Sequence, residues 1–154
     1  MKMSGRILII EDDEFKANDI QSLLKRELPT YAVLVVGDVG SGVKALRGSV
    51  FDLVILDIAL PSRQLRPGGG STASLLSGGV EIIYRLEEEN RSVPVVILTQ
   101  YPDIEIEGEQ VPVSKMRSVP ERYFDANIVA CIRYMREDQA SWTTTLSNVL
   151  KDLG

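Results

Sequence analysis

The sequence predicts an α/β fold in which helices cover both faces of a parallel β-sheet. Five short aliphatic runs alternate along the chain with longer amphipathic segments, which is the order of a parallel sheet whose strands are connected by helices. The runs are apolar at successive positions rather than at every second one, as expected for strands that are buried on both faces. With 154 residues, the chain is long enough for one domain with a substantial core.

The predicted strands and helices alternate along the chain. Strands are predicted for the runs RILII (6–10), AVLVV (32–36), DLVIL (52–56), VPVVILT (93–99) and VPVSK (111–115). Helices are predicted for the amphipathic segments 13–28, 41–48, 78–90 and 120–138. The first helix ends before Pro29, and Pro120 suits the first turn of the last one. Residues 100–110 lack helical periodicity, so we expect the helix after the fourth strand to be short or absent.

Composition and charge narrow the classes of function. The net charge is −5 and the chain has no dense block of lysine and arginine, which argues against nucleic-acid binding. Cys131 is the single cysteine, so we expect a cytoplasmic protein in which this thiol is a small buried hydrophobe. We expect neither a signal peptide nor a transmembrane span, because the apolar run near the N-terminus is short and no run approaches the roughly 20 residues that span a bilayer. We therefore expect no membrane association.

Polar residues stand where the predicted strands end. Glu11 and Asp12 follow the first strand, Asp57 follows the third, and Thr99 and Lys115 end the fourth and fifth. Ligands of an open parallel sheet bind beyond the carboxyl ends of its strands, so we expect these side chains to share one rim. Crowded carboxylates repel one another unless a cation lies among them, and oxygen ligands suit Mg²⁺, whereas the absence of histidine argues against zinc. A carboxylate beside such an ion can attack phosphorus, which predicts a phosphoryl-acceptor site.

Each of these residues alone has an ordinary structural explanation. Acids after a strand often belong to the N-terminus of a helix. Asp57 alone would serve equally well as a helix cap, and Thr99 as a hydroxyl that bonds its own backbone. Their joint occurrence at the ends of three strands favours a site. Within the acidic run we expect Glu11 and Asp12 to face Asp57, and residues 13–14 to begin the first helix.

Four motifs resemble the receiver domains of response regulators in two-component signalling. They are ILIIEDDE for the acidic pair, FDLVILDIALP for the phosphoacceptor, GGVEIIYRL for the glycine that opens helix three, and VPVVILT for the strand-end hydroxyl. The resemblance covers most of the chain. It implies a flavodoxin-like, doubly wound sheet of five parallel strands in the order 2-1-3-4-5, with helices on both faces.

The same resemblance implies a role for each residue at the rim. Asp57 would accept the phosphoryl group, Thr99 would bond one of its oxygens, and Lys115 would pair with that oxygen. Mg²⁺ would be held by Glu11 (directly or through water), Asp12, Asp57 and the backbone carbonyl of Ala59. A histidine kinase or phosphotransfer protein would supply the phosphate, and a further protein would receive the signal. We expect no conventional enzyme activity beyond Mg²⁺-dependent self-phosphorylation and slow dephosphorylation.

The sequence departs from the family pattern around the site. Residues 62–78 form an insertion beside the phosphoacceptor, rich in Gly and Ser. The segment 100–110 is about the shortest crossover that can join parallel strands. Met116 follows Lys115 where the family has proline, and the usual aromatic residue is either missing or supplied by Tyr101.

The chain is predicted to end in an extra helix. We assign residues 1–138 to the receiver domain and residues 139–154 to this helix, whose apolar stripe comprises Trp142, Leu146, Val149 and Leu150. Too little chain follows residue 138 for an output domain, so we expect a stand-alone receiver. A missing fourth helix would uncover one face of the sheet. Our hypothesis is that the insertion, the last helix or a second copy in a homodimer covers it.

Three other functions stay open. The segment GDVGSGVK (37–44) nearly matches a nucleotide-binding P-loop, but its lysine comes one residue late and neither Ser nor Thr follows. A haloacid-dehalogenase-like phosphatase would need a second aspartate two residues after Asp57, where Ala59 stands. A degenerate receiver would keep the fold as an interaction module without accepting phosphate.

Overall fold

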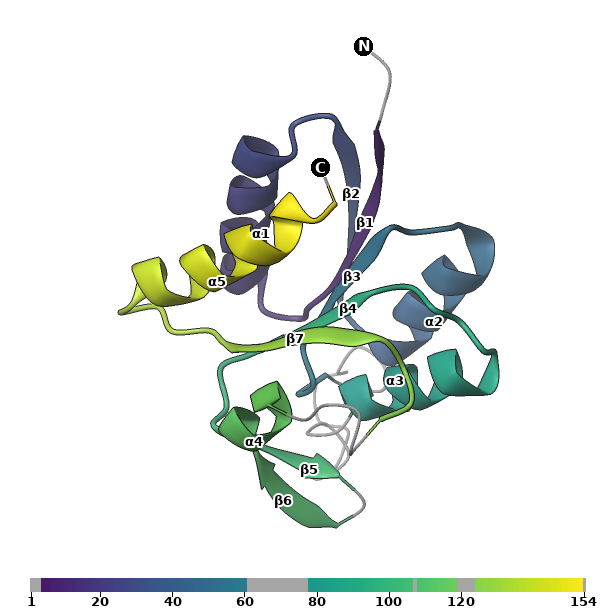
Figure 1. Ribbon diagram of the computed structural model, residues 1–154. Helices are drawn as coiled ribbons and strands as arrows, with labels where there is room; N and C mark the ends of the chain where they lie inside the picture. The colour runs from purple at the N-terminus through teal and green to yellow at the C-terminus, as the bar shows by residue number, and fades with distance from the viewer. Residues whose placement is uncertain (1–3, 61–77, 107, 119–123, 154) are drawn as a thin grey trace, which may run out of the picture.

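Five parallel strands form the central sheet of the computed structural model, in the order β2-β1-β3-β4-β7 (Figure 1). The structure describes residues 4–60, 78–106, 108–118 and 124–153. The sheet strands are β1 (Gly5–Ile10), β2 (Tyr31–Val36), β3 (Leu53–Leu56), β4 (Val95–Thr99) and β7 (Ile128–Arg133). Because β7 is the fifth strand of this sheet along the chain, the order equals 2-1-3-4-5. The predicted fold class, a flavodoxin-like doubly wound sheet, is confirmed.

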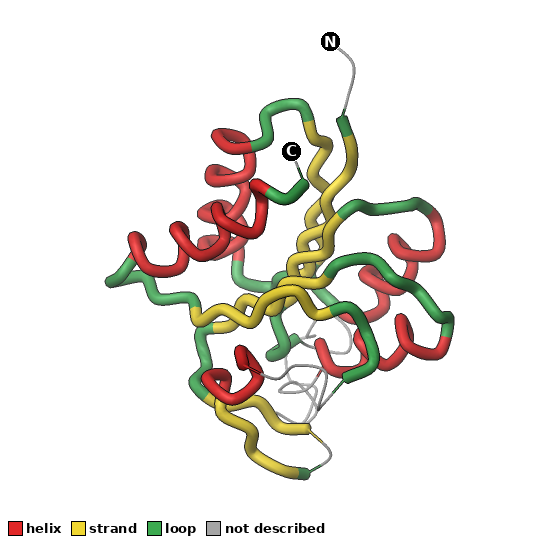
Figure 2. The backbone as a smooth tube through the Cα atoms, in the orientation of Figure 1, coloured by secondary structure: helices red, strands yellow, loops and turns green. Residues whose placement is uncertain are grey.

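Helices cover both faces of the sheet, as Figure 2 shows. They are α1 (Glu14–Glu27), α2 (Val39–Gly48), α3 (Gly78–Glu88), α4 (Val113–Ser118) and α5 (Gln139–Lys151). Ile7 and Ile9 of β1 belong to the core under α1 and α5, whereas Leu8 and Ile10 belong to the core under α2 and α3. Successive residues of one strand thus enter two different cores, which explains why the runs are apolar throughout.

The acidic run divides between β1 and α1 as predicted. Asp13 is the N-cap of α1, because its side chain accepts a hydrogen bond from the backbone N–H of Lys16 at 3.1 Å, and Glu14 is the first helical residue. The helix ends at Glu27, just before Pro29. In the segment that resembles a P-loop, Asp38 caps α2 by accepting from the backbone N–H of Ser41 at 2.6 Å. That segment is therefore the capped start of an ordinary helix.

The predicted fifth strand and the helix after it are wrong. The segment 111–115 ends a small hairpin and begins α4, and the fifth sheet strand is β7, inside the predicted helix 120–138. β7 pairs in parallel with β4, and Thr99 lies opposite Arg133. Residues 128–135 carry apolar side chains at both helical and strand spacing, and a short run of this kind does not distinguish the two. Cys131 is buried as predicted, but in a strand.

A β-hairpin and a short helix stand between β4 and β7, so the prediction that the helix after the fourth strand is short or absent is confirmed. The hairpin consists of β5 (Asp103–Ile106) and β6 (Glu109–Pro112), and Gly108 adopts φ +84° in its turn. Its buried residues join the same core as α2 and α3, together with residues of α4 and the following segment: Ile104, Ile106, Val111, Val113, Met116 and Phe124. The hairpin and α4 therefore pack on the same face of the sheet as α2 and α3. Of the predicted insertion 62–78, all but Gly78 lies outside the described residues.

The helix predicted near the C-terminus is present as α5 and packs beside α1 (Figure 1). Trp142, Leu146 and Leu150 are buried in the core that also contains residues of α1. Because β7 directly precedes it, α5 follows the last strand of the sheet and lies on the face opposite the hairpin. None of the described helices has the length and apolar character needed to cross a bilayer.

The packing of α5 predicts a large loss of stability for Leu146→Ala. Leu146 is fully buried, so the substitution removes apolar contacts and leaves a cavity, and we expect the free energy of unfolding to fall by about 2–5 kcal/mol. Leu34→Ala is the matched control, because Leu34 is 45% exposed on β2; its cost should stay below about 1 kcal/mol. Urea denaturation followed by circular dichroism measures both. Equal losses would contradict the placement of α5.

Candidate functional site

Three carboxylates converge at the carboxyl ends of β1 and β3. Glu11 and Asp12 follow β1, Asp57 follows β3, and one oxygen of each lies within 4.8 Å of the other two. The strands that carry them are neighbours in parallel register, and the backbone N–H of Asp57 donates to the carbonyl oxygen of Ile10 at 3.0 Å. Glu11 and Asp57 are buried, whereas Asp12 is exposed. The structure thus brings together the three acids that the sequence analysis selected.

A buried lysine lies against these acids. Lys16 Nζ, on α1, lies 2.6 Å from Glu11 Oε1 and 3.5 Å from Asp57 Oδ2, and it donates to the carbonyl oxygen of Leu98 at 2.6 Å. Its side chain is 1% exposed, and the ring of Tyr134 lies 5.6 Å from Nζ. The sequence analysis missed this residue. The available signal was its position on the apolar face of the first helix, where a charged side chain is unexpected.

Burial and mutual repulsion set the electrostatics of the cluster. Desolvation raises the pKa of Glu11 to about 8, and the negative charge of Asp57 acts in the same direction, while Lys16 opposes both. Desolvation, followed by the charge of Asp57, also raises the pKa of Asp12. Lys16 therefore compensates only part of the negative charge, and the cluster favours a further proton or cation.

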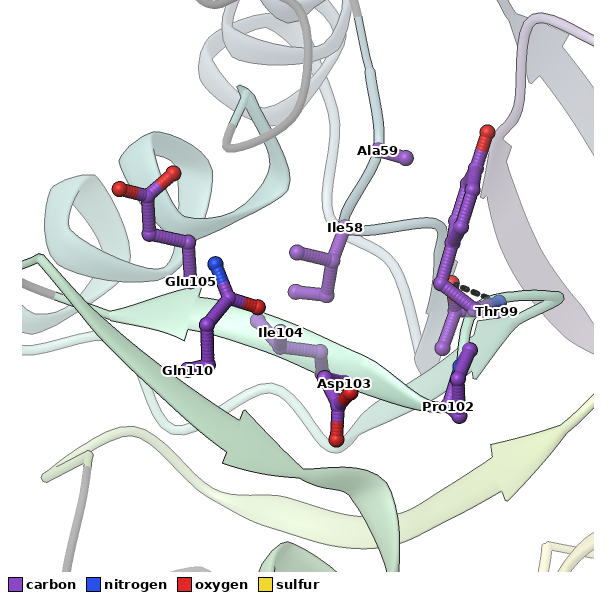
Figure 3. A pocket seen from close by; sticks show the side chains of 9 residues that line it. Ile58, Ala59, Thr99, Pro102, Asp103, Ile104, Glu105 and Gln110 are labelled. Atoms are coloured by element: carbon purple, nitrogen blue, oxygen red, sulfur yellow. Dashed lines mark hydrogen bonds between the residues drawn. The ribbon is translucent and has the colours of Figure 1, made fainter.

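Ala59 and Thr99 lie on the other side of Asp57. The backbone N–H of Ala59 donates to Asp57 Oδ1 at 3.1 Å. Thr99 is fully buried at the end of β4, and its Oγ1 accepts from the backbone N–H of Tyr101 at 3.3 Å. These residues line a pocket of about 220 Å³ between the Asp57 loop and the hairpin, which Figure 3 shows with Ile104 and Gln110 on the hairpin side.

Lys115 and Tyr101 complete the set of residues selected from the sequence. Lys115 is an exposed residue of α4, so it does not end a strand of the five-stranded sheet. The strand on which its assignment rested is the one corrected above. Tyr101 is 41% exposed and lines the pocket beside Thr99.

Close packing of α3 fixes the backbone around Asp57. The backbone N–H of Gly79 donates to the carbonyl oxygen of Ile58 at 2.9 Å. A Cβ atom at position 79 would lie 2.5 Å from the carbonyl oxygen of Asp57 and 2.5 Å from Cα of Ile58, closer than real contacts allow. The approach therefore requires glycine, which explains the glycine at the start of the third helix.

An aspartate at the end of a central strand, flanked by two acids on the rim of a 2-1-3-4-5 sheet, is the arrangement that the resemblance to receiver domains of two-component signalling implies. The sequence model of the response regulator receiver domain matches residues 7–117, and the chain belongs to this family. The resemblance found in the sequence motifs is confirmed.

Several known proteins are similar over most of their length. The Detocs response regulatory protein DtcB of Vibrio alginolyticus is 36% identical over 148 residues, which cover 94% of this chain and 99% of DtcB. The structure of the phosphorylated cyanobacterial phytochrome response regulator RcpA superposes with a TM-score of 0.62 at 18% identity, covering 97% of this chain and 90% of RcpA. The Mn²⁺-bound form of response regulator Rcp1 gives a TM-score of 0.61 at 16% identity, with 94% and 91% covered. At these identities the two structures support the fold.

The contact between α3 and the Asp57 backbone predicts that Gly79→Ala is destabilising. The added methyl group has to displace backbone atoms, and we expect the free energy of unfolding to fall by about 1–3 kcal/mol. Gly48→Ala is the matched control, because a Cβ atom at this helical position meets nothing within 4 Å; it should be neutral or stabilising by up to about 1 kcal/mol. Chemical denaturation of both variants decides, and a Gly79→Ala variant as stable as the wild type would show that the contact is not tight.

Proposed function

We propose that this receiver accepts a phosphoryl group on Asp57 in a Mg²⁺-dependent reaction and signals through contacts with another protein. The observation that carries the proposal is the cluster of Glu11, Asp12 and Asp57, whose carboxylate oxygens lie within 4.8 Å of one another at the carboxyl rim of the sheet. Such a cluster suits a hard cation, and a cation beside an aspartate suits phosphoryl transfer.

The donor set fits Mg²⁺. Glu11 Oε1 is buried and, among the described residues, has the ion pair with Lys16 but no well-directed hydrogen bond. Asp12, Asp57 and the carbonyl oxygen of Ala59 would complete a set of oxygen ligands, the kind that Mg²⁺ prefers. When bound, the ion would offset negative charge on the transferring phosphoryl oxygens. Rcp1 was solved with Mn²⁺, so a protein of this fold takes a divalent cation.

The chain's own residues orient the nucleophile. The N–H of Ala59 holds Asp57 Oδ1, which leaves Oδ2 facing Lys16. A carboxylate oxygen of Asp57 attacks phosphorus and forms an O–P bond, while the P–N bond of a phosphohistidine donor breaks and its electron pair leaves on nitrogen. Thr99 is the residue whose hydroxyl would then donate to a phosphoryl oxygen. For the charge that faces this oxygen, the family resemblance gives Lys115, whereas Lys16 is the residue whose Nζ lies 3.5 Å from Asp57 Oδ2.

The family supports a proposal for the phosphate donor and for the protein that receives the signal. Receiver domains of two-component systems interact with kinases or phosphotransfer proteins, and we propose a histidine kinase or a phosphotransfer protein as the phosphate source. The target would be another protein, and a homodimer remains part of this proposal. A degenerate receiver is the second candidate, because a hairpin and α4 stand where the family has a helix after the fourth strand.

Phosphorylation of Asp57 is tested with the full chain, Mg²⁺ and phosphoramidate. Intact mass spectrometry should show one added phosphoryl group on the wild type and none on Asp57→Asn, whose amide is a poor nucleophile. Circular dichroism checks that the variant is folded. An adduct that persists in Asp57→Asn would rule out this acceptor. A folded wild type that takes no phosphate would favour the interaction module.

Mg²⁺ binding separates the acids of the site from those of the helix. Asp12→Asn removes a proposed ligand, so we expect the affinity for Mg²⁺ to fall by about 10-fold or more, because even the loss of a residue that only orients a ligand typically costs about 10–100-fold. Glu14→Gln removes an acid two residues away at the start of α1, and its effect should remain within about twofold. Isothermal titration calorimetry measures both. Equal losses would mean that Asp12 is not a ligand and that the acids act only through their summed charge.

A further inference from the structure

We propose that Lys16, from α1, supplies the positive charge that faces the phosphoryl group on Asp57. This inference rests on the proposed phosphorylation. It assigns to Lys16 the pairing with a phosphoryl oxygen that the family resemblance implied for Lys115. The carrying observation is the position of Lys16 Nζ, 3.5 Å from Asp57 Oδ2 and 2.6 Å from the carbonyl oxygen of Leu98.

The ammonium group is held in place before any phosphate arrives. Of its three N–H donors, one bonds the carbonyl oxygen of Leu98, and Nζ lies 2.6 Å from Glu11 Oε1. Leu98 precedes Thr99 on β4, so its carbonyl fixes Lys16 to the strand that also carries the hydroxyl of the site. The contact with Asp57 is the longest of the three, which leaves one donor for an oxygen attached to that carboxylate.

Burial makes this charge effective. The side chain of Lys16 is 1% exposed, and a preorganised charge in a site that excludes water stabilises developing charge far more than one in solvent. Packing alone does not require an ammonium there, because apolar residues of similar size often replace buried ion pairs without loss of stability. Lys115 is exposed on α4, where water and salt screen its charge.

The transfer step balances with Lys16 protonated throughout. With phosphoramidate as the donor, an Asp57 oxygen forms the new O–P bond and the P–N bond breaks toward nitrogen. The nitrogen leaves as ammonia, with the protons that it already carries. Lys16 gives up no proton; one of its N–H groups donates to a phosphoryl oxygen in the transition state and in the product.

Lys16 also bears on the metal. Its contact with Glu11 Oε1 involves an oxygen of the proposed Mg²⁺ set, so the ammonium and the ion compete for this carboxylate. Replacing Lys16 by a neutral residue should therefore leave Mg²⁺ binding unchanged or tighten it, while phosphorylation slows. Damage to the structure would weaken both together, because both depend on the same carboxylates.

The experiment compares phosphorylation rates with phosphoramidate at saturating Mg²⁺ in the wild type, Lys16→Met, Lys115→Met and Lys25→Met. Lys25 is an exposed residue of the same helix and serves as the matched control. We expect Lys16→Met to slow the reaction by about 10²–10³-fold, the usual effect of removing one preorganised charge or donor. Lys25→Met should remain within about twofold of the wild type, and Lys115→Met should slow the reaction much less than Lys16→Met does. Calorimetry should give Lys16→Met a Mg²⁺ affinity equal to or above that of the wild type.

Several results would overturn the assignment. They are a Lys16→Met rate close to the wild type, a large loss in Lys115→Met alone, or a parallel loss of Mg²⁺ affinity in Lys16→Met. If Lys16→Met does not fold, the double variant Glu11→Gln/Lys16→Met is compared with Glu11→Gln. The change at Glu11 removes the buried carboxylate that the loss of Lys16 would leave unpaired. Equal rates in these two variants would also overturn the assignment. A wild type without any adduct refutes the proposed function itself, whereas an active wild type with an equally active Lys16→Met refutes the role of Lys16 alone.

Discussion

The parallel pairing of β1 with β3 is the constraint on which the site depends. It places Glu11 and Asp57 side by side at the rim, both buried, and thereby creates a local excess of negative charge. Lys16 compensates part of that charge. It lies on α1, which packs on the apolar residues of one face of β1. The position of the Lys16 ammonium group therefore depends on the strand order, on the cap at Asp13 and on the register of α1.

Much of this arrangement could be predicted because strands buried on both faces have a clear sequence pattern. The first four sheet strands and the meeting of Glu11, Asp12 and Asp57 follow from aliphatic runs and the polar residues that end them, whereas the strand order was implied by the resemblance to receiver domains. The split of the acidic run follows from capping preferences, which act over a few residues and need no tertiary information.

The remaining parts depend on contacts that are distant in sequence. β7 carries the residues IVACIR, whose apolar positions suit a helix and a strand equally, and only pairing with β4 decides between them. The strand predicted to end in Lys115 was wrong for the same reason. The segment 111–115 ends the hairpin and begins α4 instead. Lys16 was missed because a lysine within a helix is usually solvated; its burial becomes visible only when the carbonyl of Leu98, 82 positions away, is placed beside it.

The residues that flank the segment 61–77 determine how far the length of that segment can change without destabilising the fold. Leu60 and Gly78 flank the segment, and the backbone of Gly78 lies against the carbonyl oxygen of Leu60, so the two flanking residues are in direct contact. The entropy of closing a loop grows only with the logarithm of its length, and a doubling costs about 0.6 kcal/mol. Because the two flanking residues are in contact, a change in the number of residues between Leu60 and Gly78 carries only a small entropic cost in folding. Leu60 is three residues after Asp57, and Gly79 packs on the Asp57 backbone. The length of this segment, which begins four residues after Asp57, can therefore change in evolution while the stability of the sheet stays nearly unchanged.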